Sequence, residues 1–374
     1  MTTSDTNNKQ QRAKRYEAIH NVLFLVETAY ALALLVAFLY TGASDFLADA
    51  SQALSSNPWV STALYGAVVI YGTKILFLPL NWFSGFFLEH HFELSNQKFG
   101  GWLFDQAKSF AMNLLLGVVI LDVVYFLMRR AGAWWWLEAG FFFLLFGIVM
   151  SVLYPVLILP LFYKLRPLDN ESLQQRLTAL AKQVGATVLG VYRMAMNEKT
   201  KKANAAFAGL GATKRIILGD TLLDQFSEDE IEVVMAHEMA HYKQGDISKL
   251  IAWSSMTTFI GLKITDVVLR WALPKFGFTE ISNLGAFPLL ALCLFGFGLV
   301  TMPLNNAFSR WREWKADHTA LVLTRNPDGF IRAMRKLAEQ NLADLSPHPC
   351  IEFLLHDHPS LSRRIAWAEQ WQPD

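Results

Sequence analysis

Charged residues are scarce in this chain. Only 17% of its 374 residues are Asp, Glu, Lys or Arg, whereas 53% are hydrophobic, and the mean hydropathy is +0.26. An ordinary soluble domain carries about 25% charged residues, so this composition excludes a chain that is soluble throughout. It favours a membrane protein that also has a polar domain.

Cysteine and net charge are also low. Cys293 and Cys350 are the two cysteines, so the sequence has no disulfide framework, and we expect two free thiols. The formal net charge is +1. Without a basic footprint there is no case for nucleic acid as a partner.

One motif stands out against this background, His237-Glu238-Met239-Ala240-His241. Residues four apart lie on one face of an α-helix, so His237 and His241 can bind a single metal ion, and Glu238 can reach a water on it. This is the H-E-x-x-H arrangement of zinc metalloproteases. The alternative is a chance match, since the chain contains nine histidines.

The flanking residues predict the helix that this motif requires. Ser227 and Glu230 have the spacing of a capping box. Gly245 stands where a helix is expected to end. We therefore expect a helix over about 228–244, with both histidines near its C-terminal end.

A catalytic zinc usually takes three protein ligands and keeps one position for water, so a third ligand must come from elsewhere. Glu313 and Asp317 lie four apart in the last polar region and share a helix face. Glu313 could bind the metal while Asp317 accepts the other ring proton of a ligating histidine. The alternative is an ion-pairing couple on a solvated helix.

Long apolar runs predict six membrane helices, at about 22–41, 61–87, 109–128, 134–163, 250–272 and 284–305. Pro155 and Pro160 predict a kink or break in the fourth. The N-terminal tail is basic and the short loop 42–60 is acidic, so the positive-inside rule predicts both termini in the cytoplasm. Arg129 and Arg130, on the expected outer side, argue mildly against this.

These runs divide the chain into five regions. We expect a cytoplasmic tail (1–20), four membrane helices (21–163), a metalloprotease region with the H-E-x-x-H helix (164–249), a hairpin of two spans (250–308) and a C-terminal part of the protease region (309–374). Within the polar regions, the residue patterns predict a helix at 170–184, strands at 188–195 and 215–218, and helices at 309–324, 327–342 and 361–371.

Several separate stretches resemble the type I CAAX prenyl proteases, which are multi-span membrane endopeptidases of the gluzincin clan that trim prenylated proteins. The resemblance covers about residue 89 to the end, in matching order and spacing. It is carried by 95–97 with 102–108, 204–207, 214–223, the motif at 237–241, 313–317, and His358-Pro359 with Arg364.

The resemblance implies a mainly α, multi-span membrane protein with a gluzincin-type zinc metalloprotease domain of helices and a small β-sheet. It implies one Zn²⁺ per chain, with Glu313 as the third ligand, and it places Asn204 on the edge strand that holds the substrate backbone. It also implies that His358 and Arg364 lie near the zinc, where they stabilise the oxyanion or bind the peptide. The alternative for His358-Pro359 is a helix-start turn. The family has seven spans, whereas six are found here.

The expected function is therefore a zinc endopeptidase with Glu238 as the general base. Its partners would be the lipid bilayer and a peptide or protein substrate, prenylated or otherwise membrane-associated. We expect a bacterial cytoplasmic membrane with the active site on the cytoplasmic side; the endoplasmic reticulum membrane is the alternative. Rival functions are a quality-control protease for membrane proteins and a non-catalytic scaffold with structural zinc. Cleavage inside the bilayer is disfavoured, because 227–246 is too polar for a membrane helix.

Overall fold

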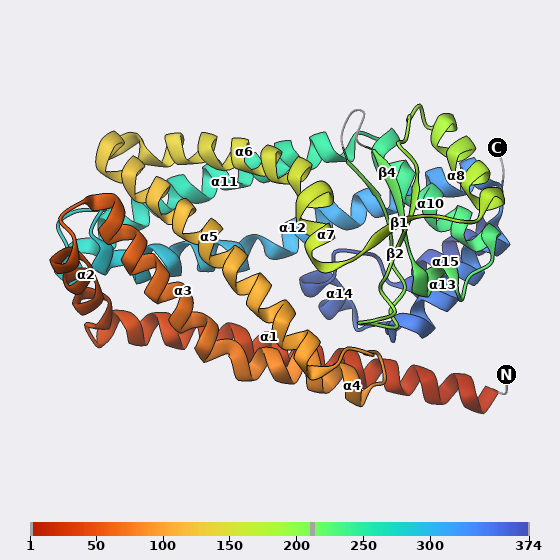
Figure 1. Cartoon of the computed structure of the whole chain (residues 1–374), viewed down its shortest axis with the longest axis horizontal. Helices are drawn as coiled ribbons and strands as arrows, with labels where there is room; N and C mark the ends of the chain where they lie inside the picture. Colours follow the sequence, from red (N-terminus) through yellow and green to blue (C-terminus); the bar gives the residue numbers. More distant parts are fainter. Residues whose placement is uncertain (1–2, 210–213, 373–374) are drawn as a thin grey trace.

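Long helices at one end of the molecule and a small α/β unit at the other make up the fold (Figure 1). The computed structural model describes residues 3–209 and 214–372. The long helices are α1 (Thr3–Tyr40), α3 (Pro58–Trp82), α5 (Phe99–Ala131), α6 (Trp135–Leu153), α11 (Asp246–Ala272) and α12 (Phe287–Thr324). They correspond in order to the six predicted spans, and the mainly α fold class is confirmed.

Four helical stretches of the described residues are long and apolar enough to cross a membrane: Asn8–Tyr40, Pro58–His91, Phe99–Phe162 and Leu284–Thr324. The third of these contains both α5 and α6. Helix α11, which the sequence analysis counts as a span, is not among the four. Helices suit the interior of a lipid bilayer, because each helix satisfies its backbone hydrogen bonds internally, without water.

The prediction of a loop at 42–60 is wrong, because most of this stretch forms α2 (Ala43–Leu54). The predicted interruption after the fourth span is present: α6 gives way to a π-helix at Tyr154–Ile158, which contains Pro155, and then to α7 (Leu159–Phe162). The π-turn accommodates a proline that lacks an N–H to donate.

Close packing joins α6 to α11 in the bundle. A Cβ added to Gly140 would lie 2.1 Å from the ring of Phe259, so only glycine lets the two helices approach this closely. Nearer the end of the bundle, the indole of Trp135 donates to Asp266 Oδ1 at 2.8 Å, and both side chains are buried.

Helix α12 corrects a second prediction. The sequence suggested a membrane span ending near 305 and a separate helix at 309–324, but the two form one continuous helix of 38 residues, with Pro303 inside it. The same helix therefore passes from the bundle into the α/β unit (Figure 1). Any side chain on its second half is fixed relative to the membrane helices.

The sheet of the α/β unit has four strands in the order β1-β2-β4-β3. β2 (Val191–Met194) and β4 (Arg215–Gly219) are the two predicted strands and pair in parallel. β1 (Leu165–Pro167) and β3 (Ala205–Ala208) are antiparallel edge strands that the sequence analysis did not delimit.

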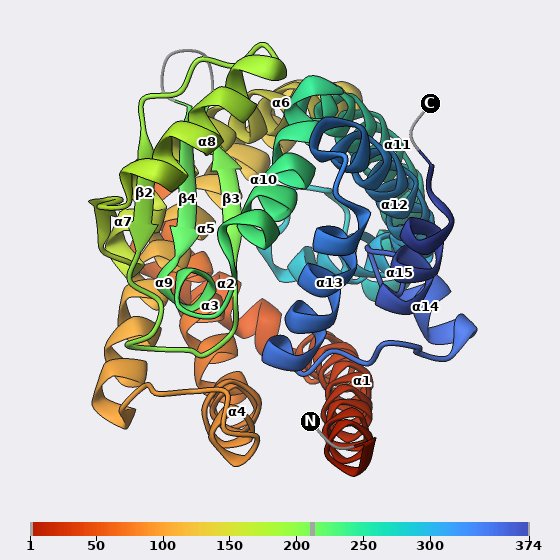
Figure 2. The same cartoon turned by 90° about the vertical axis from the view of Figure 1, so that its right-hand side faces the viewer.

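Four helices share one hydrophobic core with this sheet (Figure 2). They are α8 (Glu171–Gln183), α10 (Glu228–Lys243), α13 (Pro327–Asn341) and α15 (Leu361–Gln370), close to the predicted ranges. The shared core includes Leu177, Ile216, Leu222, Met235, Ala236, Met239 and Phe330. Because the core-facing residues of α10 are apolar and closely packed, the core fixes the orientation of this helix.

The N-terminus of α10 shows the predicted capping box. Glu230 Oε2 accepts the N–H of Ser227 at 2.9 Å, and Ser227 Oγ accepts the N–H of Glu230 at 3.4 Å. Lys336 Nζ donates to the same carboxylate at 2.7 Å, and Arg332 Nε lies 3.6 Å from its other oxygen. Burial alone would raise the pKa of Glu230, but Lys336 and the N–H of Ser227 outweigh it and hold the pKa below its ordinary value.

We predict that Glu230→Gln lowers the apparent melting temperature in detergent at pH 7. Glutamine keeps the capping hydrogen bond but loses the ion pairs. Loss of these charge-assisted bonds should lower the free energy of unfolding by about 1–2 kcal/mol. The folded-state pKa lies below the unfolded value of about 4.3, so this stabilisation is complete above that pH and is lost as the pH falls through the folded-state pKa.

Thermal scans of wild type and variant between pH 7 and pH 3 test this. The difference in melting temperature should narrow below about pH 4, where the carboxylate protonates. Glu198→Gln is the control, since Glu198 is 68% exposed and only 3.7 Å from an equally exposed Lys164. A difference that stays constant with pH would contradict the assignment.

Candidate metal centre

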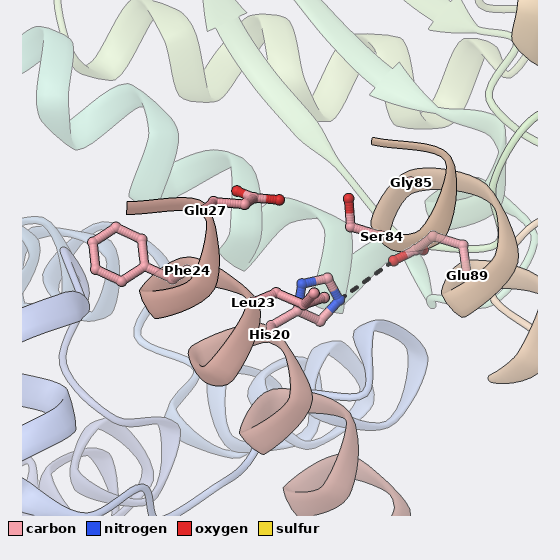
Figure 3. A pocket seen from close by; sticks show the side chains of 7 residues that line it. All are labelled: His20, Leu23, Phe24, Glu27, Ser84, Gly85 and Glu89. Atoms are coloured by element: carbon pink, nitrogen blue, oxygen red, sulfur yellow. Dashed lines mark ion pairs between the residues drawn. The ribbon is translucent and has the colours of Figure 1, made fainter. Parts of the chain in front are cut away.

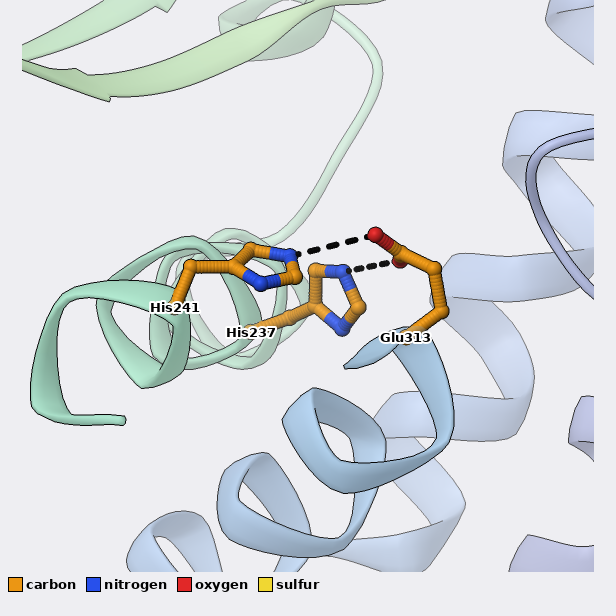
Figure 4. Close-up of side chains that lie close together, drawn as sticks. All are labelled: His237, His241 and Glu313. Atoms are coloured by element: carbon orange, nitrogen blue, oxygen red, sulfur yellow. Dashed lines mark ion pairs between the residues drawn. The ribbon is translucent and has the colours of Figure 1, made fainter. Parts of the chain in front are cut away.

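Helices α10 and α12 bring the three predicted ligands together. His237 and His241 lie on α10, Glu313 lies on α12, and one potential ligand atom of each lies within 4.8 Å of the others. His237 Nε2 is 3.0 Å from Glu313 Oε2, and His241 Nε2 is 3.3 Å from Glu313 Oε1 (Figure 4). Among the described residues, no other group of three His, Cys, Asp or Glu side chains meets this criterion.

The spacing and chemistry of these atoms fit a metal ion. Nitrogen and oxygen ligands about 2.0–2.2 Å from a tetrahedral zinc lie about 3.3–3.5 Å from each other, close to the separations here. Glu313 is 3% exposed, and its Oε2 makes no hydrogen bond with the part of the chain that the structure describes. A buried carboxylate oxygen without a hydrogen bond is costly, and a cation at this point would satisfy it.

The far sides of both histidine rings are held by carboxylates. Asp317 Oδ1 lies 2.8 Å from His237 Nδ1, and Asp246 Oδ2 lies 2.9 Å from His241 Nδ1. Both carboxylates are buried. This arrangement orients each ring and leaves Nε2 as the ligand atom, as in many carboxylate–histidine–zinc sites.

These contacts also change proton affinities. Burial would lower the pKa of His237, but Asp317 and Glu313 outweigh burial and raise it to about 9. Burial would raise the pKa of Glu313, but the two histidines hold it far below its ordinary value. Glu313 is therefore an anion throughout the physiological range. The buried site needs a cation, and a metal ion would take the place of the His237 proton.

Asp246 is a site residue that the sequence analysis missed. It follows Gly245, whose φ of 68° turns the chain sharply at the end of α10. The first residue of α11, Asp246, is thereby placed beside His241 in the last turn of α10. The signal was present as Gly245, eight residues after the first histidine of the motif. Its consequence for Asp246 depends on the left-handed turn, which sequence spacing alone does not reveal.

Glu238 lies on α10 between the two histidines and is partly exposed, unlike its neighbour His237. Within the described residues, its carboxylate makes no hydrogen bond or ion pair. A carboxylate in this position is free to accept a proton from a water at the metal.

His358 lies on the turn between α14 (Pro349–Leu355) and α15 and is half-exposed. Its Nε2 is 3.5 Å from Glu313 Oε2, and its Nδ1 is 2.8 Å from Asp357 Oδ1. Burial would lower the pKa of His358, but Asp357 and Glu313 raise it above the ordinary value. The first turn of α15 begins only at Leu361, with Ser360 as its N-cap, so His358 precedes the helix start.

Arg364 occupies a different environment from His358. It is 6% exposed, and its guanidinium donates to both oxygens of Asp317, from Nε at 2.8 Å and from Nη2 at 2.6 Å. Burial would lower its pKa, but the Asp317 carboxylate outweighs this and raises it. The arginine therefore fixes the carboxylate that holds His237.

Asn204 immediately precedes the edge strand β3, and its side chain is exposed. Its carbonyl accepts the N–H of Gly219 at 2.9 Å, and a Cβ on Gly219 would lie 2.9 Å from that carbonyl oxygen. Strand β3 contacts α10, the helix that carries both histidines. Among the described strands, β3 pairs on one side only, with β4. Such an edge strand can in general pair with an extended peptide.

A second polar cluster lies outside the metal centre, in a cavity of about 380 Å³ between α1 and the segment 84–89 (Figure 3). His20, Glu27, Ser84 and Glu89 line it, and His20 Nε2 is 3.8 Å from Glu89 Oε1. Glu89 is also 2.9 Å from Lys202 Nζ and bonds to the hydroxyl of Tyr16. This cluster joins the first helix to the α/β unit.

Comparison with known proteins gives two family matches that together span the chain. Residues 3–164 match the model described as the CAAX prenyl protease N-terminal domain, five membrane helices. Residues 167–372 match peptidase family M48.

Individual relatives agree with these matches. The chain is 29% identical to an uncharacterized metalloprotease of Bacillus subtilis, YhfN, over 96% of this chain and 85% of that protein. It is 29% identical to CAAX prenyl protease 1 of Saccharomyces cerevisiae, over 77% of this chain and 67% of the relative. The crystal structure of S. mikatae Ste24p superposes with a TM-score of 0.86 at 22% identity, covering 97% of this chain and 89% of that one, which shows a shared fold.

We predict that Asp317→Ala and Asp246→Ala each weaken zinc binding about 10- to 100-fold, the usual effect of removing a carboxylate that orients a ligating histidine. Competition titration against a chromophoric chelator measures the affinity directly. The matched control is Lys249→Gln, because Lys249 bonds to the other oxygen of Asp246 at 2.9 Å and touches neither ring. Unchanged zinc affinity in both aspartate variants would contradict a role for these residues in orienting the histidine ligands.

Proposed function

Because the chain belongs to peptidase family M48 and is a multi-pass membrane metalloprotease, we propose that it hydrolyses peptide bonds with one zinc ion held by His237, His241 and Glu313. The observation that carries this proposal is the convergence of two imidazole nitrogens on a buried carboxylate whose Oε2 has no hydrogen-bond partner among the described residues. Three protein ligands leave a fourth position open, which is typical of catalytic rather than structural zinc.

The chemistry follows from the residues around that position. A zinc ion held by these ligands would supply Lewis-acid chemistry: it would lower the pKa of a bound water to about 7 and would polarise the substrate carbonyl. Glu238 accepts the proton of the attacking water and then delivers it to the leaving amine. Asp317, Arg364 and Asp246 keep the two imidazoles oriented while this happens.

Of the two residues proposed to stabilise the oxyanion, His358 has the stronger support. Its ring is half-exposed beside Glu313, so it can reach a substrate carbonyl. Its raised pKa favours the protonated ring, whose N–H groups can donate hydrogen bonds to the oxyanion. Arg364 is buried and both of its bonds to Asp317 are short, so its role is to position Asp317 and, through it, His237. Asn204 and the free edge of β3 would hold the substrate backbone as an added strand.

We infer that the substrates are peptides with a C-terminal prenylated C-a-a-X sequence, or similar membrane-associated chains. The support is the pairing of an M48 domain with an N-terminal domain named for CAAX prenyl proteases, together with relatives in yeast and Arabidopsis named CAAX prenyl protease 1. The basic N-terminal tail favours an active site on the cytoplasmic side of the membrane. The bacterial relative that matches 96% of this chain favours a bacterial inner membrane.

A quality-control protease for membrane proteins is the second candidate. It is favoured by the match over 96% of this chain to a bacterial metalloprotease, since a bacterium without prenylated proteins would need a different substrate. The chemistry would be the same, so only the substrate distinguishes the two functions.

The deciding experiment uses purified protein in detergent with a farnesylated C-a-a-X peptide and its unprenylated twin. We predict cleavage of the farnesylated peptide, and we predict that Glu238→Gln retains zinc but loses hydrolysis, because only the proton acceptor is removed. Mass spectrometry of the products and metal analysis of both proteins give the two readouts. Turnover in the variant would remove Glu238 from the base role, and equal cleavage of both peptides would favour the quality-control function.

The role of His358 is tested separately. We predict that His358→Ala lowers kcat about 10²- to 10³-fold, as loss of one oxyanion donor does, with an unchanged zinc content. Arg364→Lys, in contrast, should weaken zinc binding, because it loses the two-pronged contact with Asp317. Full activity of His358→Ala would support the alternative, a turn that only leads into α15.

A further inference from the structure

The segment between α13 and α15 carries His358 and is held from two sides. This segment, residues 344–358, contains the short helix α14 and lies between the end of α13 and the N-cap of α15. Its last residues form the turn beside Glu313. The placement of His358 therefore depends on what fixes the two ends of a segment that is only partly buried.

Helix α12 holds the second half of the segment. Arg310 Nη1 donates to the carbonyl of Glu352 at 2.9 Å and also to the carbonyl of His356, and Asn306 Nδ2 donates to the carbonyl of Leu354 at 2.7 Å. The carbonyls of Glu352 and Leu354 lie in the last turn of α14, where carbonyls lack partners further along the helix, although that of Glu352 also accepts the N–H of His356 at 3.3 Å. Arg310 precedes Glu313 by one helical turn, so the metal ligand and this contact share one rigid element.

Helix α1 holds both ends of the segment through one side chain. Glu17 Oε2 accepts the backbone N–H of Asp344 at 3.1 Å, and Glu17 Oε1 lies 3.2 Å from His356 Nε2. Gln10 Nε2 adds a bond to Asp344 Oδ1 at 2.9 Å, one and a half to two turns earlier on the same face. The carboxylate of Glu17 thus closes the segment into a loop with its two ends 12 residues apart.

The neighbouring residue keeps α1 in place. Tyr16 is 8% exposed, its hydroxyl bonds to Glu89 and accepts a bond from Lys202 Nζ at 2.9 Å, and its ring packs edge-on against Phe92. Successive residues point about 100° apart on a helix. Tyr16 therefore fixes α1 to the segment around 89–92 while Glu17 faces 344–358.

We propose that Glu17 is a positioning residue for catalysis: by binding Asp344 and His356 it holds His358 at the metal centre. The proposal rests on the proposed function, because it needs His358 to act on the substrate. It means that the helix leading into the first membrane span sets the geometry of an active-site side chain more than 340 residues later in the chain.

The test is a kinetic comparison of Glu17→Ala and Glu17→Gln with the wild-type enzyme on the cleaved peptide. We expect kcat of Glu17→Ala to fall about tenfold with KM changed less than twofold, since a displacement well below 1 Å at a reacting group has effects of this order. Glu17→Gln, whose amide oxygen can still accept the N–H of Asp344, should retain most of the activity. The matched control is Lys9→Ala, which breaks the pair between α1 and Glu339 and leaves 344–358 untouched.

Two further measurements separate positioning from a general loss of structure. Hydrogen–deuterium exchange should rise in peptides covering 344–358 in Glu17→Ala, but not in Lys9→Ala, with zinc content and melting temperature unchanged. In a His358→Ala background, Glu17→Ala should cause no further loss of kcat, because the side chain that it positions is already gone.

Three outcomes would overturn the proposal: wild-type kcat in Glu17→Ala, an equal loss with and without His358, or unchanged exchange in 344–358. Full activity of His358→Ala would also overturn it, because nothing would remain to be positioned. The proposed function has its own test, loss of hydrolysis in Glu238→Gln, so it can stand while the role of Glu17 fails.

Discussion

The packing of α10 against α12 is the contact on which the rest of the site depends. It places Glu313 opposite two histidines and so concentrates a buried negative charge at one point. That charge is tolerable only with compensating positive groups nearby. Two imidazoles face Glu313 and would share a cation with it. Asp317 and Asp246 orient the rings but add negative charge, and Arg364 balances that of Asp317.

Both helices of this contact are held in place by the rest of the fold. On one side, the apolar residues of α10 pack into the core of the α/β unit, and its first turn is fixed by the capping box and Lys336. On the other, α12 continues without interruption into the helix bundle. The metalloprotease unit is therefore not a domain on a flexible linker, because Glu313, the proposed third zinc ligand, is carried by a helix that enters the membrane part.

The sequence predicted the local features well because they depend on near neighbours. Helical spacing and the capping box located α10, and the four-residue spacing of Glu313 and Asp317 identified a candidate face of α12. Features that depend on distant partners or on unusual turns were not accessible. The onset of polarity near 309 suggested a helix break that the structure does not have. Asp246 required the left-handed turn at Gly245, and the contact of Glu17 with Asp344 joins residues 327 positions apart.

The unbroken length of α12 makes it a lever. Glu313 lies 26 residues after the first residue of the helix, which at 1.5 Å per residue is about 39 Å. A change in tilt of about 1.5 degrees at the far end would shift a point at this distance by about 1 Å, a displacement large enough to alter catalytic geometry. Tilt responds to the thickness of the surrounding bilayer. If Glu313 is the third zinc ligand, as proposed, the geometry of the metal site would depend on the thickness of the bilayer around α12.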